Sequence, residues 1–289
     1  MGVFPALATG KKLSLLAKSD NVVLPKATMP QQAIDHYENF PVASWLCPAR
    51  LRPAVVAIYH FARTADDLAD EGDAPAKQRL EDLSEYRADL AMCMVGRPSP
   101  QSRWSELFAS LHEALQAYAL PTQPLFDLLE AFEQDIVYTE KGEKYRTRAE
   151  LLDYCRRSAN PVGRLMLHLY GLHDAQSLEQ SDAICSALQL INFWQDRTRD
   201  LALGRDYLPR DSTFVQELQF ARTLMTQGAP LVHRVPGRAG WELRAMVQGG
   251  LCILSKVDAL YAKNASSPLP RPVINKWDTA GIVWKCFWM

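Results

Sequence analysis

Five oxygen-bearing side chains stand at four-residue intervals in two largely apolar segments of the sequence. Asp66 and Asp70 form the first aspartate row, and Asn192, Asp196 and Asp200 form the second. Residues four apart share one face of an α-helix, so each row would line a single face. Like charges at this spacing cost a helix roughly 0.2–0.5 kcal/mol per pair, which a bound cation would offset.

The chemistry of the two rows favours a hard cation that is shared with a phosphorylated substrate. None of the five ligand candidates is His or Cys, and Mg²⁺ typically combines one or two carboxylates with water and substrate phosphate. The sequence contains no E-x-x-H, H-E-x-x-H, G-x-S-x-G, G-x-G-x-x-G or P-loop pattern, so the common alternative chemistries lack their residues. A solvated helix face that carries incidental acids remains the structural alternative.

Helical periodicity dominates from Gln31 onward, and strand alternation is almost absent, which predicts an all-α protein. Proline residues suit the first turn of a helix that ends near Glu71 and carries the first row. A second long helix, expected over 178–202, carries the second row. Helical bundles build sites between facing helices, so the two rows are expected to face each other across a central apolar cavity.

Local signals predict where several other helices begin or break. Capping boxes are expected at Thr147 with Glu150 and at Ser177 with Gln180, and Ser99 is expected to cap a helix over 100–119. Pro161 should break or kink the helix that begins at residue 148.

The composition is typical of one large globular domain. The chain has 289 residues, of which 48% are hydrophobic and 22% charged, and its net charge of -1 gives no basic excess for a nucleic-acid partner. The predicted organisation is a loosely ordered arm over 1–29, one domain over 30–265, and a linker with an aromatic tail over 266–289. Six scattered cysteines and the lack of a signal peptide or membrane-spanning run predict a cytoplasmic protein.

The tail combines aromatic and basic residues in a pattern that suits a membrane surface. Trp277, Trp284 and Trp288 lie at helical spacing, and Lys276 and Lys285 add positive charge. Peripheral contact with the inner membrane surface is therefore one expectation. A terminal helix that docks on the protein core is the other.

Four motifs together resemble the squalene/phytoene synthase family, in the same order and over roughly residues 31–260. They are HYENFPVAS at 36–44, YHFARTADDLADEGD at 59–73, YCRRSANPVGRL at 154–165, and LQLINFWQD with GRDYLP within 188–209. Within that family they look most like the branch that makes hydroxysqualene in bacterial hopanoid biosynthesis. The resemblance implies a single all-α isoprenoid-synthase domain that binds Mg²⁺ through both aspartate rows.

The resemblance also implies roles for individual residues. The aspartates of both rows and Tyr154 would serve catalysis, with Asn192 as a further metal ligand. Prenyl diphosphate would be contacted by His36, Asn39, Tyr59, Arg63, Arg205 and Tyr207, and the cavity would be lined by Tyr154, Ala159, Gly163 and Gln189. On pattern alone Tyr154 is an ordinary core residue, and Arg205 is equally an exposed loop cation.

The implied reaction is Mg²⁺-dependent ionisation of presqualene diphosphate, followed by rearrangement and water capture to give hydroxysqualene and diphosphate. Synthesis of presqualene diphosphate or squalene from two farnesyl diphosphates is the close alternative. Relatives that join two farnesyl diphosphates usually carry an acid just before the last aspartate of the second row, where this sequence has Arg199. A non-catalytic helical partner is the alternative of another class, and association with other enzymes of the pathway is a further expectation.

Overall fold

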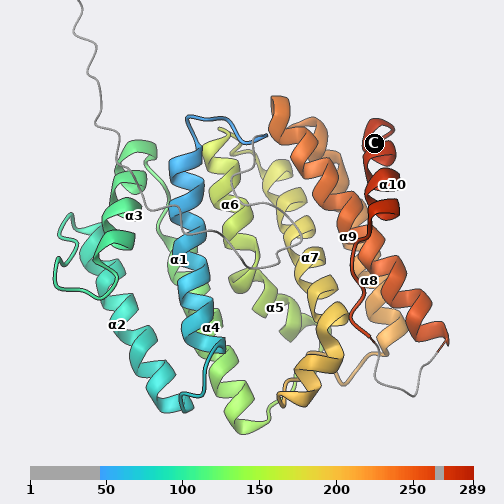
Figure 1. The fold of residues 1–289 in the computed structure, drawn as a ribbon, viewed down its shortest axis with the longest axis horizontal. Coiled ribbons are helices and arrows are strands. Elements are labelled where there is room, and N and C mark those ends of the chain that lie inside the picture. Colours follow the sequence, from blue (N-terminus) through green and yellow to red (C-terminus); the bar gives the residue numbers. More distant parts are fainter. Residues whose placement is uncertain (1–45, 264–269) are drawn as a thin grey trace, which may run out of the picture. The chain divides into compact units, whose positions relative to one another are not determined.

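The structure is a computed structural model that describes residues 46–263 and 270–289 (Figure 1). Every described residue belongs to one compact unit of the chain. Within the described ranges the chain is all helical, as predicted. The helices are α1 (Arg52–Asp70), α2 (Ala76–Met94), α3 (Ser105–Tyr118), α4 (Gln123–Lys141), α5 (Arg148–Ser158), α6 (Asn160–Leu169), α7 (Ala175–Ala202), α8 (Phe214–Gly228), the 3-10 helix η1 (Ala229–His233), α9 (Gly237–Lys263) and α10 (Lys276–Phe287).

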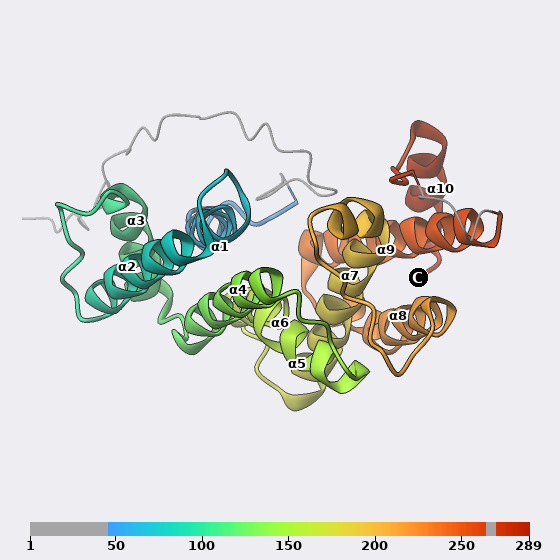
Figure 2. The same cartoon turned by 90° about the horizontal axis from the view of Figure 1, so that it is seen from below.

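Two hydrophobic cores meet at α6, which lies between α4 and α7 (Figure 2). Leu165 and Leu169 are four residues apart and join the core built by α1 to α4. Leu167 points to the opposite side and joins the core built mainly by α5, α7, α8 and α9. This helix is therefore apolar on two faces, which ties the two halves of the bundle together.

Helix α1 presents the first aspartate row because its apolar face is held in the core. Phe61 is fully buried, and its carbonyl accepts a 3.1 Å hydrogen bond from the Tyr86 hydroxyl. At the C-terminal end, Arg79 donates to the carbonyl oxygens of Ala69 and Gly72, each at 2.6 Å. These bonds satisfy carbonyls that lack helical partners and fix the end of the helix beside Asp70.

Helix α7 carries the second row and packs closely against its neighbours at glycines. A Cβ on Gly163 of α6 would lie 2.5 Å from both Cys185 Sγ and Ser181 Oγ. A Cβ on Gly228, at the end of α8, would lie 2.5 Å from Ile184 Cγ1. Both glycines therefore permit contacts that any larger residue would prevent.

Several predicted helix boundaries are confirmed. Thr147 caps α5, where its hydroxyl accepts a 3.2 Å hydrogen bond from the Glu150 backbone N–H. Pro161 lies in the first turn of α6, directly after α5 ends at Ser158.

Two predicted caps are wrong. Helix α3 begins at Ser105 with Trp104 at its N-cap, so Ser99 caps nothing. Helix α7 begins at Ala175, and its cap is Asp174, which accepts a 3.0 Å hydrogen bond from the backbone N–H of Ser177. The predicted capping box at Ser177 fails because Asp174 starts the helix three positions earlier and accepts hydrogen bonds from both the backbone N–H and the hydroxyl of Ser177.

Candidate active site

Arg63 organises the acidic residues of α1. Its guanidinium lies 3.2 Å from Asp66, 2.7 Å from Asp67 and 2.7 Å from Glu71. Burial raises the pKa of Asp66 to about 7, with a further contribution from the charge of Asp70, while Arg63 acts in the opposite direction. The predicted first row thus consists of two carboxylates whose joint ionisation is costly without a compensating cation.

Arg205 brings the two aspartate rows together. Gly204, with a φ of 81°, turns the chain at the end of α7, and the Arg205 backbone N–H donates a 2.8 Å hydrogen bond to the Asp200 carbonyl. The Arg205 side chain then reaches across to form an ion pair with Asp70 on α1. Burial raises the pKa of Asp200 to about 7, and the charges of Asp196 and Asp70 raise it further. The rows therefore share one electrostatic environment.

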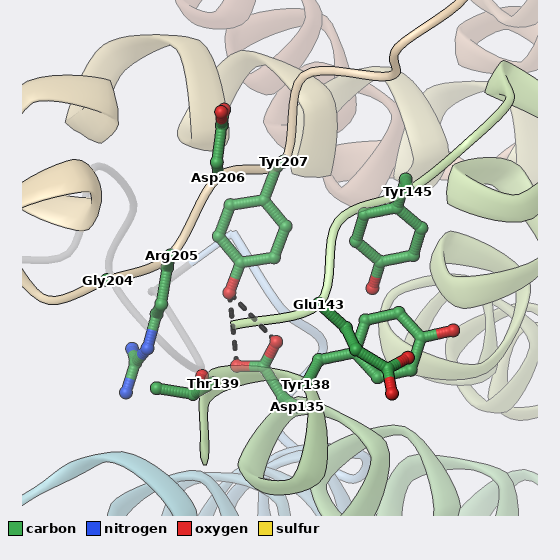
Figure 3. Close-up of a pocket in the computed structure, with 9 residues that line it drawn as sticks. All are labelled: Asp135, Tyr138, Thr139, Glu143, Tyr145, Gly204, Arg205, Asp206 and Tyr207. Carbon is green, nitrogen blue, oxygen red and sulfur yellow. Dashed lines mark hydrogen bonds between the residues drawn. The ribbon is translucent and has the colours of Figure 1, made fainter. Parts of the chain in front are cut away.

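Asp135 on α4 is a further acid beside these residues, and its side chain is half-buried (Figure 3). Its carboxylate accepts hydrogen bonds of 3.0 and 3.1 Å from the Tyr207 hydroxyl. Burial raises its pKa to about 6, although Arg205 and Tyr207 act to lower it. Nothing in the sequence marks this residue, because one Asp on an amphipathic helix carries no spacing signal.

A cluster of aromatic rings forms one wall of the site. Phe193 and Tyr207 stack with ring centroids 3.7 Å apart and an interplanar angle of 8°. Tyr154 lies 6.1 Å from Phe193 and 6.3 Å from Tyr207 between centroids, and Tyr145 lies 5.9 Å from Tyr154. Burial raises the pKa of Tyr154 well above its ordinary value, so its hydroxyl is protonated at neutral pH. The faces of these rings carry negative charge density that can stabilise a nearby cation.

Asp196 is bound by an arginine from the C-terminal segment. The Arg271 guanidinium pairs with its carboxylate, with Nη2 lying 3.3 Å from Oδ2. The adjacent Gln195 donates a 2.7 Å hydrogen bond to the Pro272 carbonyl. The segment around Pro272 therefore crosses the second row. Sequence reasoning missed Arg271 because it stands in a proline-rich linker, 75 residues after its partner.

The remaining predicted site residues have less distinctive surroundings. Tyr59 and Gln189 are half-buried, Asn192 is exposed, and Ala159 joins α5 to α6. Gly163 faces α7 at the point where its missing Cβ permits close packing, so packing alone accounts for the glycine. The predicted diphosphate contacts His36 and Asn39 lie outside the described residues. The roles predicted for all these residues stay predictions.

The donor set fits a metal that is shared with a diphosphate. Within the part of the chain that the structure describes, no three His, Cys, Asp or Glu side chains converge as an all-protein metal cage. Two separate aspartate rows that share Arg205 instead suit Mg²⁺, which takes one or two carboxylates and completes its shell with water and phosphate. The carboxylates that would hold the metal form ion pairs with Arg63, Arg205 and Arg271, which neutralise their negative charge.

A small pocket of about 10 Å³ opens beside Arg205, with room for about one water molecule. Figure 3 shows Asp135, Tyr207 and Arg205 around it, with Tyr145 and Tyr138 nearby. The pocket lies among polar and aromatic side chains, so a water held there would have hydrogen-bond partners.

The helical architecture and its paired aspartate rows define the isoprenoid-synthase fold. The chain belongs to the squalene/phytoene synthase family, whose model matches residues 34–216. It is similar to the crystal structure of squalene synthase HpnC from Alicyclobacillus acidocaldarius, with a TM-score of 0.68 and 34% identity over 78% of this chain and 89% of that one.

Two curated relatives from one organism carry different names. Hydroxysqualene synthase from Rhodopseudomonas palustris is 39% identical over 60% of this chain and 56% of its own length. Presqualene diphosphate synthase from the same organism is 32% identical over 60% of this chain and 58% of its own length. The matches thus span a little more than half the length of these relatives.

Proposed function

We propose that this protein is a Mg²⁺-dependent hydroxysqualene synthase, which converts presqualene diphosphate and water to hydroxysqualene and diphosphate. The observation that carries the proposal is the ion pair between Arg205 and Asp70, because it brings the two aspartate rows to one site. Similarity to relatives named hydroxysqualene synthase supports the choice of reaction.

The side chains on the two walls suit the charges that this reaction develops. Arg63 and Arg205 offer planar sets of N–H donors to the oxygens of a leaving diphosphate. When bound, Mg²⁺ supplies Lewis-acid stabilisation of the same leaving group. The stacked rings of Phe193 and Tyr207, with Tyr154 beside them, present π faces to the carbocation that remains after ionisation. Water that reaches this cation yields the alcohol.

Two observations favour ionisation of one diphosphate over condensation of two. Relatives named hydroxysqualene synthase are 36–39% identical to this chain, whereas those named presqualene diphosphate synthase are 29–32% identical. Arg199 also stands on the exposed side of the second row and lowers the pKa of Asp200 through its charge. A row with this added positive charge is less suited to hold metal for two diphosphates at once.

The test is incubation of purified protein with presqualene diphosphate and Mg²⁺ in ¹⁸O-labelled water, with and without NADPH. Labelled hydroxysqualene in both reactions is the expected result. Squalene formed only with NADPH would instead identify a reductive squalene synthase. Rapid conversion of farnesyl diphosphate to presqualene diphosphate would place the protein in the condensing branch.

Peripheral contact with a membrane and association with other enzymes of the pathway would both suit this reaction. Presqualene diphosphate and hydroxysqualene both carry long hydrocarbon chains, so exchange with a lipid phase avoids exposing those chains to water.

A further inference from the structure

Helix α10 is docked on α9 by one face only (Figure 2). Ile282 and Cys286 are buried against the protein, and the Cys286 carbonyl accepts a 3.0 Å hydrogen bond from Arg244 on α9. Lys256 of α9 pairs with Asp278, and Asn275 closes a capping box at the helix start. The helix is therefore held in a defined orientation, as the docking expectation required.

The opposite face of α10 is aromatic and exposed. At about 100° per residue, Trp277, Trp284 and Trp288 lie within an arc of about 40°, and the buried pair lies about 140–180° away. The exposed fractions of these tryptophans are 87%, 65% and 76%. Phe287 is 64% exposed and contacts Trp241 of α9, which is 42% exposed. We call these five residues the aromatic face.

The aromatic face is open to a ligand. Trp284, Phe287 and Trp288 line an open hollow of about 430 Å³, and the Trp284 and Trp288 rings contact each other with their centroids 5.8 Å apart. Large exposed apolar patches on soluble proteins usually mark a binding surface. Tryptophan in particular favours the boundary between lipid and water, where its ring is buried and its N–H stays hydrated.

Positive charge surrounds the aromatic face. Lys276 and Lys285 are exposed and lie about 80–100° from the tryptophan stripe, one on each side. Arg244 lies over the Trp241 ring, with its Cζ 4.7 Å from the centroid. The acid of α10, Asp278, is neutralised by Lys256. A helix with an aromatic face between cations matches the composition of helices that lie on anionic bilayers.

We propose that the aromatic face docks this protein on the surface of an anionic lipid bilayer, with α10 lying in the interface. Among the described residues, no helix is long and apolar enough to cross a membrane. The 12 residues of α10 would also span only about 18 Å, less than the hydrocarbon thickness of about 30 Å. The contact is therefore peripheral.

The docking surface is connected to the candidate active site by a short segment. Arg271 pairs with Asp196 of the second aspartate row, and Pro272 accepts a hydrogen bond from the adjacent Gln195. Trp277 follows Arg271 by only six residues, a reach of at most about 21 Å. If the proposed function holds, the bilayer can deliver the amphiphilic substrate and take up the largely apolar alcohol close to the site.

The experiment measures co-sedimentation of the full chain with vesicles of phosphatidylglycerol and phosphatidylcholine, without substrate. The test variant combines Trp277→Gln, Trp284→Gln and Trp288→Gln, and its fold is checked by circular dichroism and thermal unfolding. We expect its partitioning to vesicles to fall at least tenfold. A matched control replaces exposed apolar residues elsewhere, Met92→Gln, Val95→Gln and Val215→Gln, and should bind as the unmodified protein does.

A second variant keeps the tryptophans and tests the charges. Lys276→Gln with Lys285→Gln should weaken binding to anionic vesicles by about fivefold per lysine and leave binding to neutral vesicles unchanged. Unchanged vesicle binding by the tryptophan variant would overturn the proposal. A second result would also overturn it. If the full chain binds no vesicles and forms a dimer that the tryptophan variant dissociates, a second copy of the chain covers the aromatic face.

Turnover separates this proposal from the proposed function. With detergent-dispersed presqualene diphosphate, the tryptophan variant should keep the turnover of the full chain, because none of its changes lies in the aspartate rows. Vesicle binding without turnover in the unmodified protein would count against the proposed function and leave the docking surface standing.

Discussion

The Tyr207 hydroxyl donates hydrogen bonds of 3.0 and 3.1 Å to the carboxylate of Asp135, although the two residues are 72 positions apart in the chain. This contact fastens the loop after α7 to α4. Because Arg205 lies two residues before Tyr207, the same contact restrains the arginine that pairs with Asp70. The geometry of the candidate active site thus depends on a residue outside both aspartate rows.

Tyr207→Phe should loosen this loop while preserving the stacked ring. We expect turnover of presqualene diphosphate to fall about tenfold, and the free energy of unfolding to fall by about 0.5–1.5 kcal/mol for the lost hydrogen bond. Steady-state kinetics and denaturant unfolding measure the two effects. Tyr138→Phe is the matched control, because Tyr138 lines the same pocket but lies outside this hydrogen bond. Equal turnover in both variants would contradict the role given to Tyr207.

Asp135 should make the stability of the metal-free protein depend on pH. Its pKa is about 6 in the folded protein, against an ordinary value of 3.8, so the folded state holds the proton more tightly. The resulting stabilisation is complete below about pH 4 and is lost as the pH rises through 6. The loss is on the order of 2–3 kcal/mol, because each pKa unit corresponds to about 1.4 kcal/mol.

Asp135→Asn should remove this part of the pH dependence. Denaturant unfolding in EDTA between pH 4 and pH 8 compares the variant with the unmodified protein. We expect the difference in unfolding free energy to move in favour of the variant as the pH rises. A constant difference across this range would show that Asp135 titrates near its ordinary pKa.

Gly163→Ala should destabilise the contact between α6 and α7. The added Cβ would lie 2.5 Å from Cys185 Sγ and from Ser181 Oγ, and such overpacking typically costs about 1–3 kcal/mol. Gly281→Ala in α10 is the matched control, since no atom beyond its chain neighbours and the backbone of its own helix lies within 4 Å of the added Cβ. That change should stabilise the protein by up to about 1 kcal/mol through helix propensity. Thermal unfolding that ranks the two variants in the opposite order would contradict this packing.

The parts of the structure that could be predicted from the sequence are those set by local spacing. The four-residue steps of the aspartate rows define helix faces directly, and Pro161 breaks a helix wherever the surrounding chain lies. The start of α3 could not be predicted in this way. The Ser102 hydroxyl hydrogen-bonds to Asp89 of α2 and accepts a 2.9 Å hydrogen bond from the Trp104 N–H. This contact of the loop with α2 holds the residues before Ser105 out of α3.

The unpredicted members of the site share the same cause. Asp135 belongs to the site through its hydrogen bond with Tyr207, and Arg271 through its ion pair with Asp196. Each pair is more than 70 residues apart in the sequence. The packing of the helices determines which of these residues meet, and it produces no periodic pattern in the sequence. The cap of α7 is a further example. Asp174 is supported as the cap by an ion pair with Arg234, 2.8 Å away, which lies far along the chain.

Asp66→Ala and Asp196→Ala provide the direct test of the metal assignment. Each change should lower turnover by at least ~10²-fold, comparable to removal of one preorganised electrostatic contact. Stability should be retained, because each removes one member of a like-charged pair and leaves an arginine that is already partly exposed. Asp67→Asn is the matched control, since Asp67 also pairs with Arg63 but lies outside the row. Titration calorimetry with Mg²⁺ and inorganic diphosphate should show weaker binding in both alanine variants and little change in the control. Near-normal turnover in either folded alanine variant would overturn the assignment of that aspartate to the metal.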